Sequence, residues 1–233
     1  MTKRKQKDDH NEGLVISYLT LRKAVGIVGM ALPFVLFFGY LIQGNDCIFP
    51  PSISHYYYTG LGNYFVGTLC AIALFLFFYN GYGADKWVSK LAGSFAILVA
   101  LFPTNFGEYA DVSCSRMVNG ENAFSNTVHY VSAMLLFSAF AYFSMILFTK
   151  TDNVYTVTPE KKIRNRIYRI CGWVIIICII GIALYSFIDQ LNELLHPYKP
   201  IFVLETFALL AFGYSWLIKG DTFFKDKSGS TNK

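Results

Sequence analysis

The sequence predicts an all-α fold: a polytopic membrane protein in which six transmembrane helices form one bundle, with both termini in the cytoplasm. The first observation is composition, because 54% of the 233 residues are hydrophobic and 15% are charged. The mean hydropathy is +0.40, and soluble globular chains are more polar than this. The second is the length of the apolar runs, since a helix needs about 20 mostly apolar residues to cross a hydrocarbon core. Six stretches reach or approach that length, near residues 23 to 43, 63 to 80, 87 to 103, 128 to 148, 168 to 188 and 200 to 218.

These runs divide the chain into one membrane domain and two polar ends. Residues 1–20 are predicted to be a cytoplasmic N-terminal segment, residues 21–219 the six-helix transmembrane domain, and residues 220–233 a disordered cytoplasmic tail. No A-x-A-like cleavage site follows the first apolar run. We therefore expect this run to remain as a membrane anchor and not to be removed as a signal peptide.

The positions of lysine and arginine predict the orientation. Of the 20 basic residues, all but Arg116 and Lys199 lie before the first span, after the last span, or in the loops near residues 80 to 90 and 150 to 169. Basic residues collect on the cytoplasmic side of membrane proteins. This predicts a multi-pass protein of the bacterial inner (plasma) membrane, with membrane lipids as partners. The net charge of +5 is explained by this asymmetry, so no nucleic-acid partner is expected.

The cysteines separate by predicted location. Cys70, Cys171 and Cys178 fall inside spans, where a free thiol behaves as a small hydrophobe. Cys47 and Cys114 fall in the two longer outer loops, which face an oxidising compartment. Either these two form a disulfide that joins the loops, or both remain free thiols.

The third span carries a stripe of small residues. Ala92, Ala96 and Ala100 repeat at every fourth position, which places them on one face of a helix. Small residues at this spacing let helix backbones approach closely. The pattern predicts that this helix lies at the buried centre of the bundle.

The stretch PPSISHYYYTGLGNYFVG, residues 50 to 67, precedes the second span on the outer side. Its three consecutive tyrosines, Tyr56, Tyr57 and Tyr58, point about 100° apart in a helix and so do not share one face. We interpret them as an aromatic belt at the membrane interface. Ser52 lies one helical turn from His55, so the two could also form a nucleophile pair.

Polar groups that could carry chemistry gather on the outer side. Glu205 is the most informative, because it lies about 7 Å inside the sixth span, where an acid is costly unless it has a partner. We expect it to face His129 inside the bundle. The candidate residues of an outward-facing polar pocket are His55, His129, Glu205, Asp189 and Ser52.

Two readings of this pocket stay open. His55, His129 and Glu205 could hold a zinc ion and activate a water molecule. Alternatively, Glu205 and His129 only hydrogen-bond across helices to stabilise the packing. An H-x-x-x-H spacing, which is typical of zinc sites, is absent from the sequence.

Four segments carry a resemblance to known proteins. The patterns SxSxYYYTGLGNYFVGxLC, LAGSFAILVALFPTN, VHYVSA and ETFALLAFGYSWLIKG resemble a broad, uncharacterised family of bacterial six-span membrane proteins, over about residues 20 to 220. This resemblance implies the fold and no particular activity. The chain is more distantly similar to the superfamily of alkaline ceramidases and progestin and adiponectin receptors. That similarity implies an intramembrane zinc site, of which Ser52 or Ser54, His55 and Asp111 match the early positions.

The sequence thus leaves three functions open, and with them the question whether this is an enzyme. The one we favour is binding or passage of a lipid, a small hydrophobic molecule or an ion through the outer pocket, without catalysis. The second is a metal-dependent intramembrane hydrolase of a lipid amide or ester. The third is a small pore formed by a homo-oligomer, for which Ser132, Ser138 and Ser144 offer a partial polar stripe in the fourth span.

Overall fold

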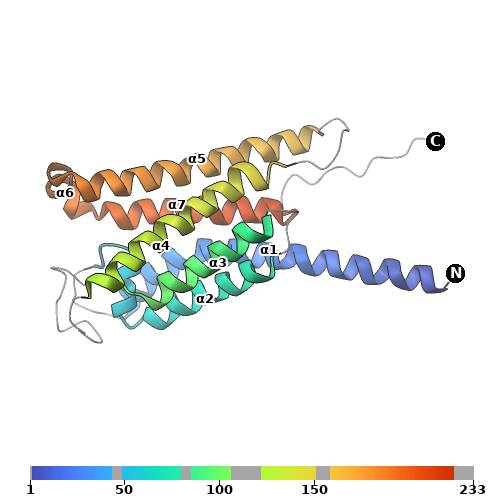
Figure 1. Ribbon diagram of the computed structural model, residues 1–233, viewed down its shortest axis with the longest axis horizontal. Coiled ribbons are helices and arrows are strands. Elements are labelled where there is room, and N and C mark those ends of the chain that lie inside the picture. The colour runs from blue at the N-terminus through green and yellow to red at the C-terminus, as the bar shows by residue number, and fades with distance from the viewer. Residues whose placement is uncertain (1, 44–48, 80–84, 106–121, 151–157, 223–233) are drawn as a thin grey trace.

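The computed structural model describes residues 2–43, 49–79, 85–105, 122–150 and 158–222, with side chains from Tyr18 onward. Within these ranges the protein is all-helical and contains no β-strand. The elements are α1 (Thr2–Ile42), η1 (Ser54–Tyr58), α2 (Gly62–Phe78), α3 (Asp85–Leu101), α4 (Ala123–Tyr142), η3 (Phe143–Leu147), α5 (Pro159–Phe187), α6 (Asp189–Leu195), η4 (His196–Tyr198) and α7 (Pro200–Lys219) (Figure 1).

Four helical stretches are long and apolar enough to cross a membrane: Tyr18–Ile42, Ala123–Leu147, Pro159–Phe187 and Pro200–Lys219. This confirms the membrane character that the hydropathy predicted. The other two long helices, α2 and α3, have 17 residues each. Each of the six predicted spans therefore corresponds to one long helix, and four of the six have the length of a full span.

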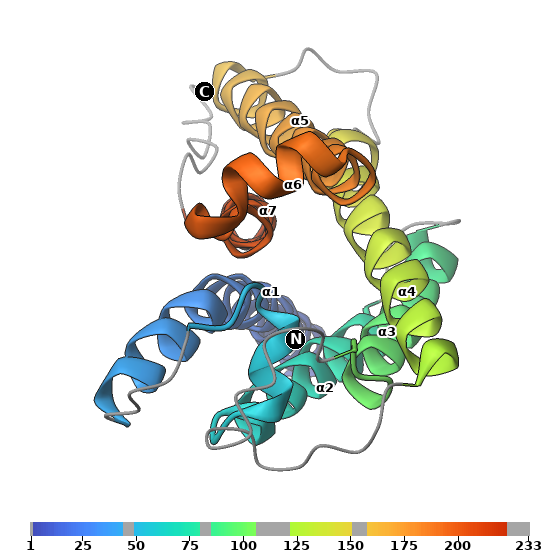
Figure 2. The same cartoon turned by 90° about the vertical axis from the view of Figure 1, so that its left-hand side faces the viewer.

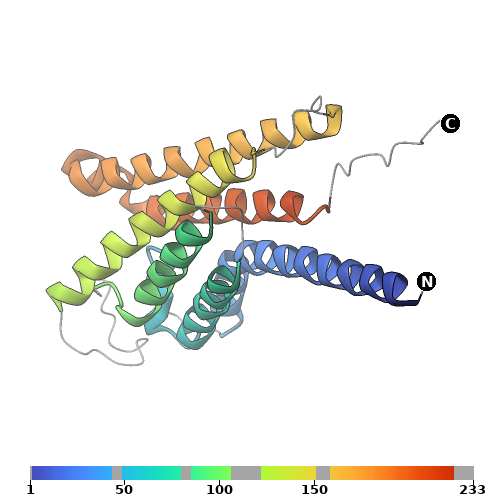
Figure 3. The ribbon, with the colours of Figure 1, turned by 45° about the vertical axis from the view of Figure 1, so that its right-hand side comes forward.

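Consecutive long helices alternate in direction, so α1 begins and α7 ends toward the same end of the molecule (Figures 1 and 3). We call this the terminal end, and the opposite one the turn end, because the turn formed by residues 50–58 lies there. The six long helices pack in the order α1, α2, α3, α4, α5 and α7, and α7 also contacts α1. The end-on view in Figure 2 shows this arrangement.

Helices α1 and α7 approach each other at two glycines. A Cβ atom added to Gly26 would lie 2.7 Å from the carbonyl oxygen of Gly213, and one added to Gly213 would lie 2.5 Å from the carbonyl oxygen of Gly26. Real side chains do not tolerate such distances. The two backbones are therefore in direct contact because neither residue has a side chain.

The small-residue face of the third span is buried as predicted, but the helix does not lie at the centre of the bundle, because its opposite face leaves Trp87, Leu91 and Leu101 exposed. Ala92, Ala96 and Ala100 are fully buried in α3, which packs against α2 and α4. On the same helix, the hydroxyl of buried Ser89 donates a hydrogen bond to the carbonyl oxygen of Leu76 in α2. The small residues thus face the neighbouring helices, as their spacing indicated.

A cluster of aromatic rings fills the bundle toward the terminal end. Trp216 of α7 is fully buried, and the centroids of four rings lie 5.2 to 5.7 Å from its own. These rings belong to Phe75, Tyr79, Phe143 and Phe148. We call these five residues the aromatic cluster. It joins α2, α4 with its π-helical extension η3, and α7.

Of the two predicted domain boundaries, one falls inside a helix and the other coincides with a helix end. The boundary between residues 20 and 21 falls inside α1, which continues without a break from Thr2 to Ile42 and includes Pro33. The boundary at residue 219 coincides with the end of α7, where the backbone N–H of Gly220 bonds back to carbonyls of the last turn. The hydropathy pattern located only the apolar part of each helix. A helix can continue into polar residues beyond its apolar part, as α1 does.

Candidate functional site

The turn of residues 50–58 is the centre of the polar contacts at the turn end. Proline begins it, and the side chain of Ser52 accepts a hydrogen bond from the backbone N–H of His55 at 3.3 Å. A serine in this position satisfies a donor that the start of a short helix leaves unpaired. The short helix η1 follows at once, with Ser52, Ile53 and Ser54 all buried.

Ser52 and His55 form the first of two serine–histidine pairs. The Oγ atom of Ser52 lies 2.6 Å from Nδ1 of His55. Which of these two atoms donates depends on the tautomer of His55, because a hydroxyl group can both donate and accept. Burial lowers the pKa of His55 to about 4, and the neighbouring His129 and Lys199 act in the same direction, while a backbone hydrogen bond with Asn105 opposes them. His55 is therefore a neutral imidazole at neutral pH.

The second pair joins the turn to α4. Nε2 of His129 lies 2.9 Å from Oγ of Ser54, and Nδ1 lies 2.7 Å from the carbonyl oxygen of Phe102. A carbonyl oxygen only accepts, so Nδ1 carries the ring hydrogen and Nε2 accepts the hydrogen of the Ser54 hydroxyl. Both side chains are buried, with 2% of His129 and 8% of Ser54 exposed. Both ring nitrogens of His129 are thus occupied.

Helix α7 holds the same turn from the other side. Oε2 of Glu205 accepts a hydrogen bond from the backbone N–H of Ile53 at 2.7 Å. One turn earlier in α7, the backbone N–H of Phe202 donates to the carbonyl oxygen of Pro51 at 3.1 Å. That N–H lies in the first turn of the helix, where it has no intrahelical partner. Glu205 is half-buried, and its second carboxylate oxygen, Oε1, makes no hydrogen bond to another described residue.

Glu205 and His129 were expected to face each other, and no hydrogen bond joins them in the described part of the chain. The two side chains bond to adjacent residues of the turn, Glu205 to Ile53 and His129 to Ser54. The sequence placed them correctly at the same end of the bundle. It did not show that the turn lies between them and supplies a partner for each.

The other predicted site residues separate from this group. Asp189 is exposed at the first position of α6, and no hydrogen bond or ion pair joins it to the described residues of the turn. Cys47 and Cys114, the predicted disulfide, lie outside the described residues, as does Asp111. The structure therefore brings together Ser52, His55, His129 and Glu205 around the turn.

The metal interpretation does not fit this arrangement. Among the residues that the structure describes, no three His, Cys, Asp or Glu side chains are grouped so that they could hold a metal ion. His129 uses both ring nitrogens in hydrogen bonds to the protein, and Glu205 directs one oxygen to a backbone N–H. Zinc needs three or four free donors at one point.

Sequence reasoning missed a second polar group beside the turn. Tyr58 donates a hydrogen bond to the carbonyl oxygen of Thr104 at 2.6 Å, and the buried Thr104 hydroxyl donates to Asn126 at 3.0 Å. Asn126 also accepts from the backbone N–H of Asn105 at 2.8 Å. The signal was the polar pair Thr104–Asn105 directly after Pro103, at the end of an apolar helix where carbonyls need partners.

The structure also differs from the predicted aromatic belt before the second span and from the predicted serine stripe in the fourth span. Tyr56 is fully buried and its ring packs against Tyr40 and Phe202, so it belongs to the core and not to an interfacial belt. In α4, Ser132 is buried, whereas Ser138 is exposed and donates to the carbonyl oxygen of its own helix. The hydroxyls of that helix therefore do not form one continuous stripe.

A comparison with known protein families, with curated proteins and with solved structures found no match to this chain.

Proposed function

We propose that this chain is a six-span protein of the bacterial inner membrane, with both termini in the cytoplasm. Its turn end faces outward and binds a lipid, a small hydrophobic molecule or an ion, without catalysis. The four span-length helices and the alternating helix directions support the topology. The basic residues near the terminal end support the orientation.

The observation that carries the binding function is the state of Glu205. One oxygen is fixed by Ile53, while the other makes no hydrogen bond to another described residue. A carboxyl group in a membrane span is costly unless it is protonated or paired. A ligand with a positive charge or a hydrogen-bond donor relieves this cost. Amine-bearing lipid head groups and small cations are the members of the proposed ligand classes that fit best.

Replacing Glu205 by glutamine tests this function. Glutamine keeps an oxygen that can accept from the Ile53 N–H, so the fold should survive, but it removes the negative charge. We expect native mass spectrometry of the purified protein to show amine-bearing lipid or cation bound to the wild type, with binding about tenfold weaker in Glu205→Gln.

The matched control is Glu193→Gln, which removes a carboxylate from an exposed position in α6. This variant should bind as the wild type does. Equal loss in both variants, or equal binding in all three proteins, would contradict the assignment to Glu205.

The orientation has its own test. Single cysteines placed between residues 110 and 125 should react with a membrane-impermeant maleimide in intact cells, because the proposal puts this loop outside. Cysteines between residues 150 and 165 should react only after the membrane is opened. The reverse pattern would overturn the orientation and the outward direction of the turn end.

A second candidate function is favoured by the geometry of the Ser54–His129 pair. The tautomer leaves Nε2 as the acceptor of the serine hydroxyl, which is how a general base activates a nucleophile. In such a reaction the Ser54 oxygen would attack a lipid ester or amide and pass its proton to His129. The leaving alcohol or amine would take that proton, and water would release the acyl group from the serine. No metal is needed for these steps.

A fluorophosphonate probe distinguishes this candidate from the favoured function. An activated serine forms a bond to phosphorus and releases fluoride. Labelling of the wild type that is lost in Ser54→Ala and retained in Ser138→Ala would establish a nucleophile. Ser52→Ala tests the neighbouring pair in the same way. Absence of labelling in protein that is folded supports the binding function without catalysis.

A further inference from the structure

The exposed face of α3, opposite its buried alanines, has a charged end and an apolar end. Lys86, Trp87 and Lys90 lie in the first two turns of the helix and are all exposed. Spacings of three and four residues place these three side chains on one face. Farther along the helix, 55% of Leu91 and 61% of Leu101 are exposed. This face therefore carries its positive charge at the terminal end and is apolar toward the turn end.

The two lysines and the tryptophan form one surface. Lys86 and Lys90 are about 6 Å apart along the helix axis, which is one turn. Nζ of Lys90 lies 5.4 Å from the centroid of the Trp87 ring, so its charge stays beside a residue nearer the terminal end. Lysines near a helix end in a membrane extend in this way to reach the lipid head groups. We call Lys86, Trp87 and Lys90 the lysine–tryptophan patch.

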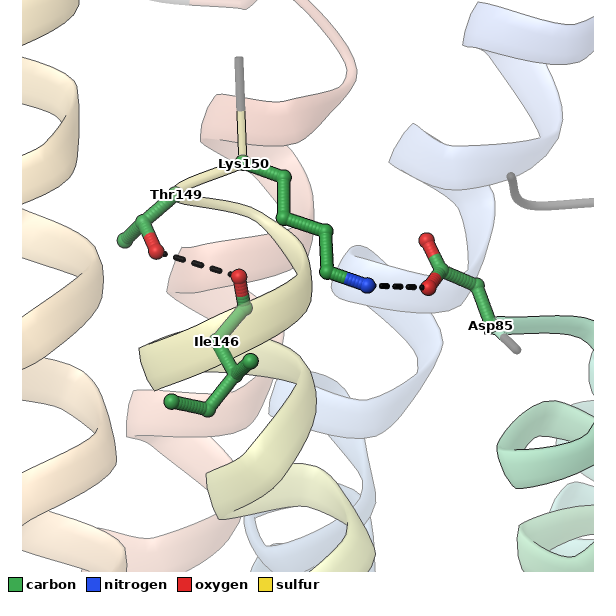
Figure 4. A network of polar contacts seen from close by, with 4 residues as sticks. All are labelled: Asp85, Ile146, Thr149 and Lys150. Carbon is green, nitrogen blue, oxygen red and sulfur yellow. Dashed lines mark hydrogen bonds and ion pairs between the residues drawn. The ribbon is translucent and has the colours of Figure 1, made fainter. Parts of the chain in front are cut away.

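The acid next to the patch in the sequence is already paired. Asp85 is buried, and its Oδ1 lies 2.8 Å from Nζ of Lys150 (Figure 4). Figure 4 shows the Lys150 side chain reaching across to the start of α3 to make this contact. Within the described part of the chain, no hydrogen bond or ion pair joins Lys86 or Lys90 to an acidic side chain. The charge of Asp85 is therefore balanced by Lys150, and the two lysines of the patch keep theirs.

We propose that this face of α3 binds an anionic phospholipid. The two ammonium groups donate to the phosphate oxygens, the Trp87 ring lies at the level of the head group, and an acyl chain runs along the apolar end of the face. Phosphatidylcholine has the same phosphate but balances it with its own ammonium group, so it fits the charge of the patch less well. The site rests on the membrane placement proposed above, but it is independent of the ligand at the turn end.

Tryptophan fluorescence of the full chain in bilayers tests this site, because Trp87 is part of the patch. Of the three tryptophans, Trp87 is 63% exposed, Trp173 is 56% exposed and Trp216 is fully buried. Trp173→Phe therefore leaves Trp87 as the one exposed tryptophan. Bromine on an acyl chain quenches a tryptophan beside it. Mixtures of phosphatidylglycerol and phosphatidylcholine, with bromine on one lipid or the other, then report which lipid lies beside Trp87.

We expect phosphatidylglycerol to be preferred at Trp87 by about fivefold or more, and Lys86→Gln and Lys90→Gln each to lower the preference by up to about fivefold, the effect of one cation near the membrane surface. Arg166→Gln is the matched control, because it removes one positive charge from an exposed position of α5. It should leave the preference unchanged. Equal quenching by the two lipids, or an equal loss of preference in Arg166→Gln, would overturn the proposal. Little quenching by either lipid would show that a second copy or another protein covers this face, and would also overturn it.

The outcome is separable from that of the proposed function. Trp87→Phe keeps Trp173 as the exposed tryptophan, and quenching of Trp173 by either lipid shows that the bundle lies in the bilayer. Quenching of Trp173 without a lipid preference at Trp87 rejects the patch and leaves the membrane placement intact. Glu205→Gln, made in the Trp173→Phe chain, should keep the preference at Trp87, because Glu205 lies at the turn end. Loss of the preference in Glu205→Gln would contradict an independent site on α3.

Discussion

Replacing Trp216 by alanine should lower the free energy of unfolding by about 3 to 5 kcal/mol, the range for large aromatic residues in well-packed cores. Trp216 is fully buried, and four aromatic rings surround it within 5.7 Å. Between helices in a membrane, packing contributes more than exclusion of water, so a cavity here removes contacts from three parts of the bundle at once.

Thermal or denaturant unfolding in detergent would measure this loss. Trp87→Ala is the control, because 63% of Trp87 is exposed and its removal leaves no internal cavity. A similar loss of stability in both variants would show that the aromatic cluster does not hold the helices together.

Gly213→Ala should destabilise the protein by roughly 1 to 3 kcal/mol through overpacking, although alanine is the better helix former. The added methyl group would lie 2.5 Å from the carbonyl oxygen of Gly26 and would also meet the side chain of Met30. Helices α1 and α7 would have to separate to accept it. The same unfolding experiment measures the effect.

Gly67→Ala provides the opposite control. A Cβ atom at Gly67 meets no atom within 4 Å, so only helix propensity acts there. We expect unchanged or increased stability, by up to about 1 kcal/mol. If Gly213→Ala were as stable as Gly67→Ala, the close contact of α1 and α7 would not be a determinant of the fold.

The helices could be predicted from the sequence because burial in a membrane requires long apolar runs. The stripe Ala92, Ala96 and Ala100 also identified the packed face of α3, since small side chains let a neighbouring helix approach, but it did not show that the other face of α3 is exposed. The extension of α1 to Thr2 was not predictable from hydropathy, because polar residues also form helices.

The partners of the polar residues were harder to predict. Glu205 and His129 were expected to be polar groups inside the bundle, but their partners are Ile53 and Ser54 of a turn that is distant in the sequence. A backbone N–H is present at every residue except proline, so sequence gives no signal for which one a carboxylate will meet. Tyr56 was assigned to the interface because the sequence does not show which rings pack against it. In the structure its ring packs against Tyr40 and Phe202.

The contacts of the turn of residues 50–58 also set an order for assembly. Ile53 and Glu205 are 152 positions apart in the chain, and Ser54 and His129 are 75 apart. During synthesis the turn leaves the ribosome long before α7. The Ile53 N–H and the Pro51 carbonyl therefore lack their α7 partners, Glu205 and Phe202, until α7 inserts. A nascent chain that stops after α5 keeps this polar turn unsatisfied beside the lipid. Insertion of α7 is therefore the step that completes the turn end.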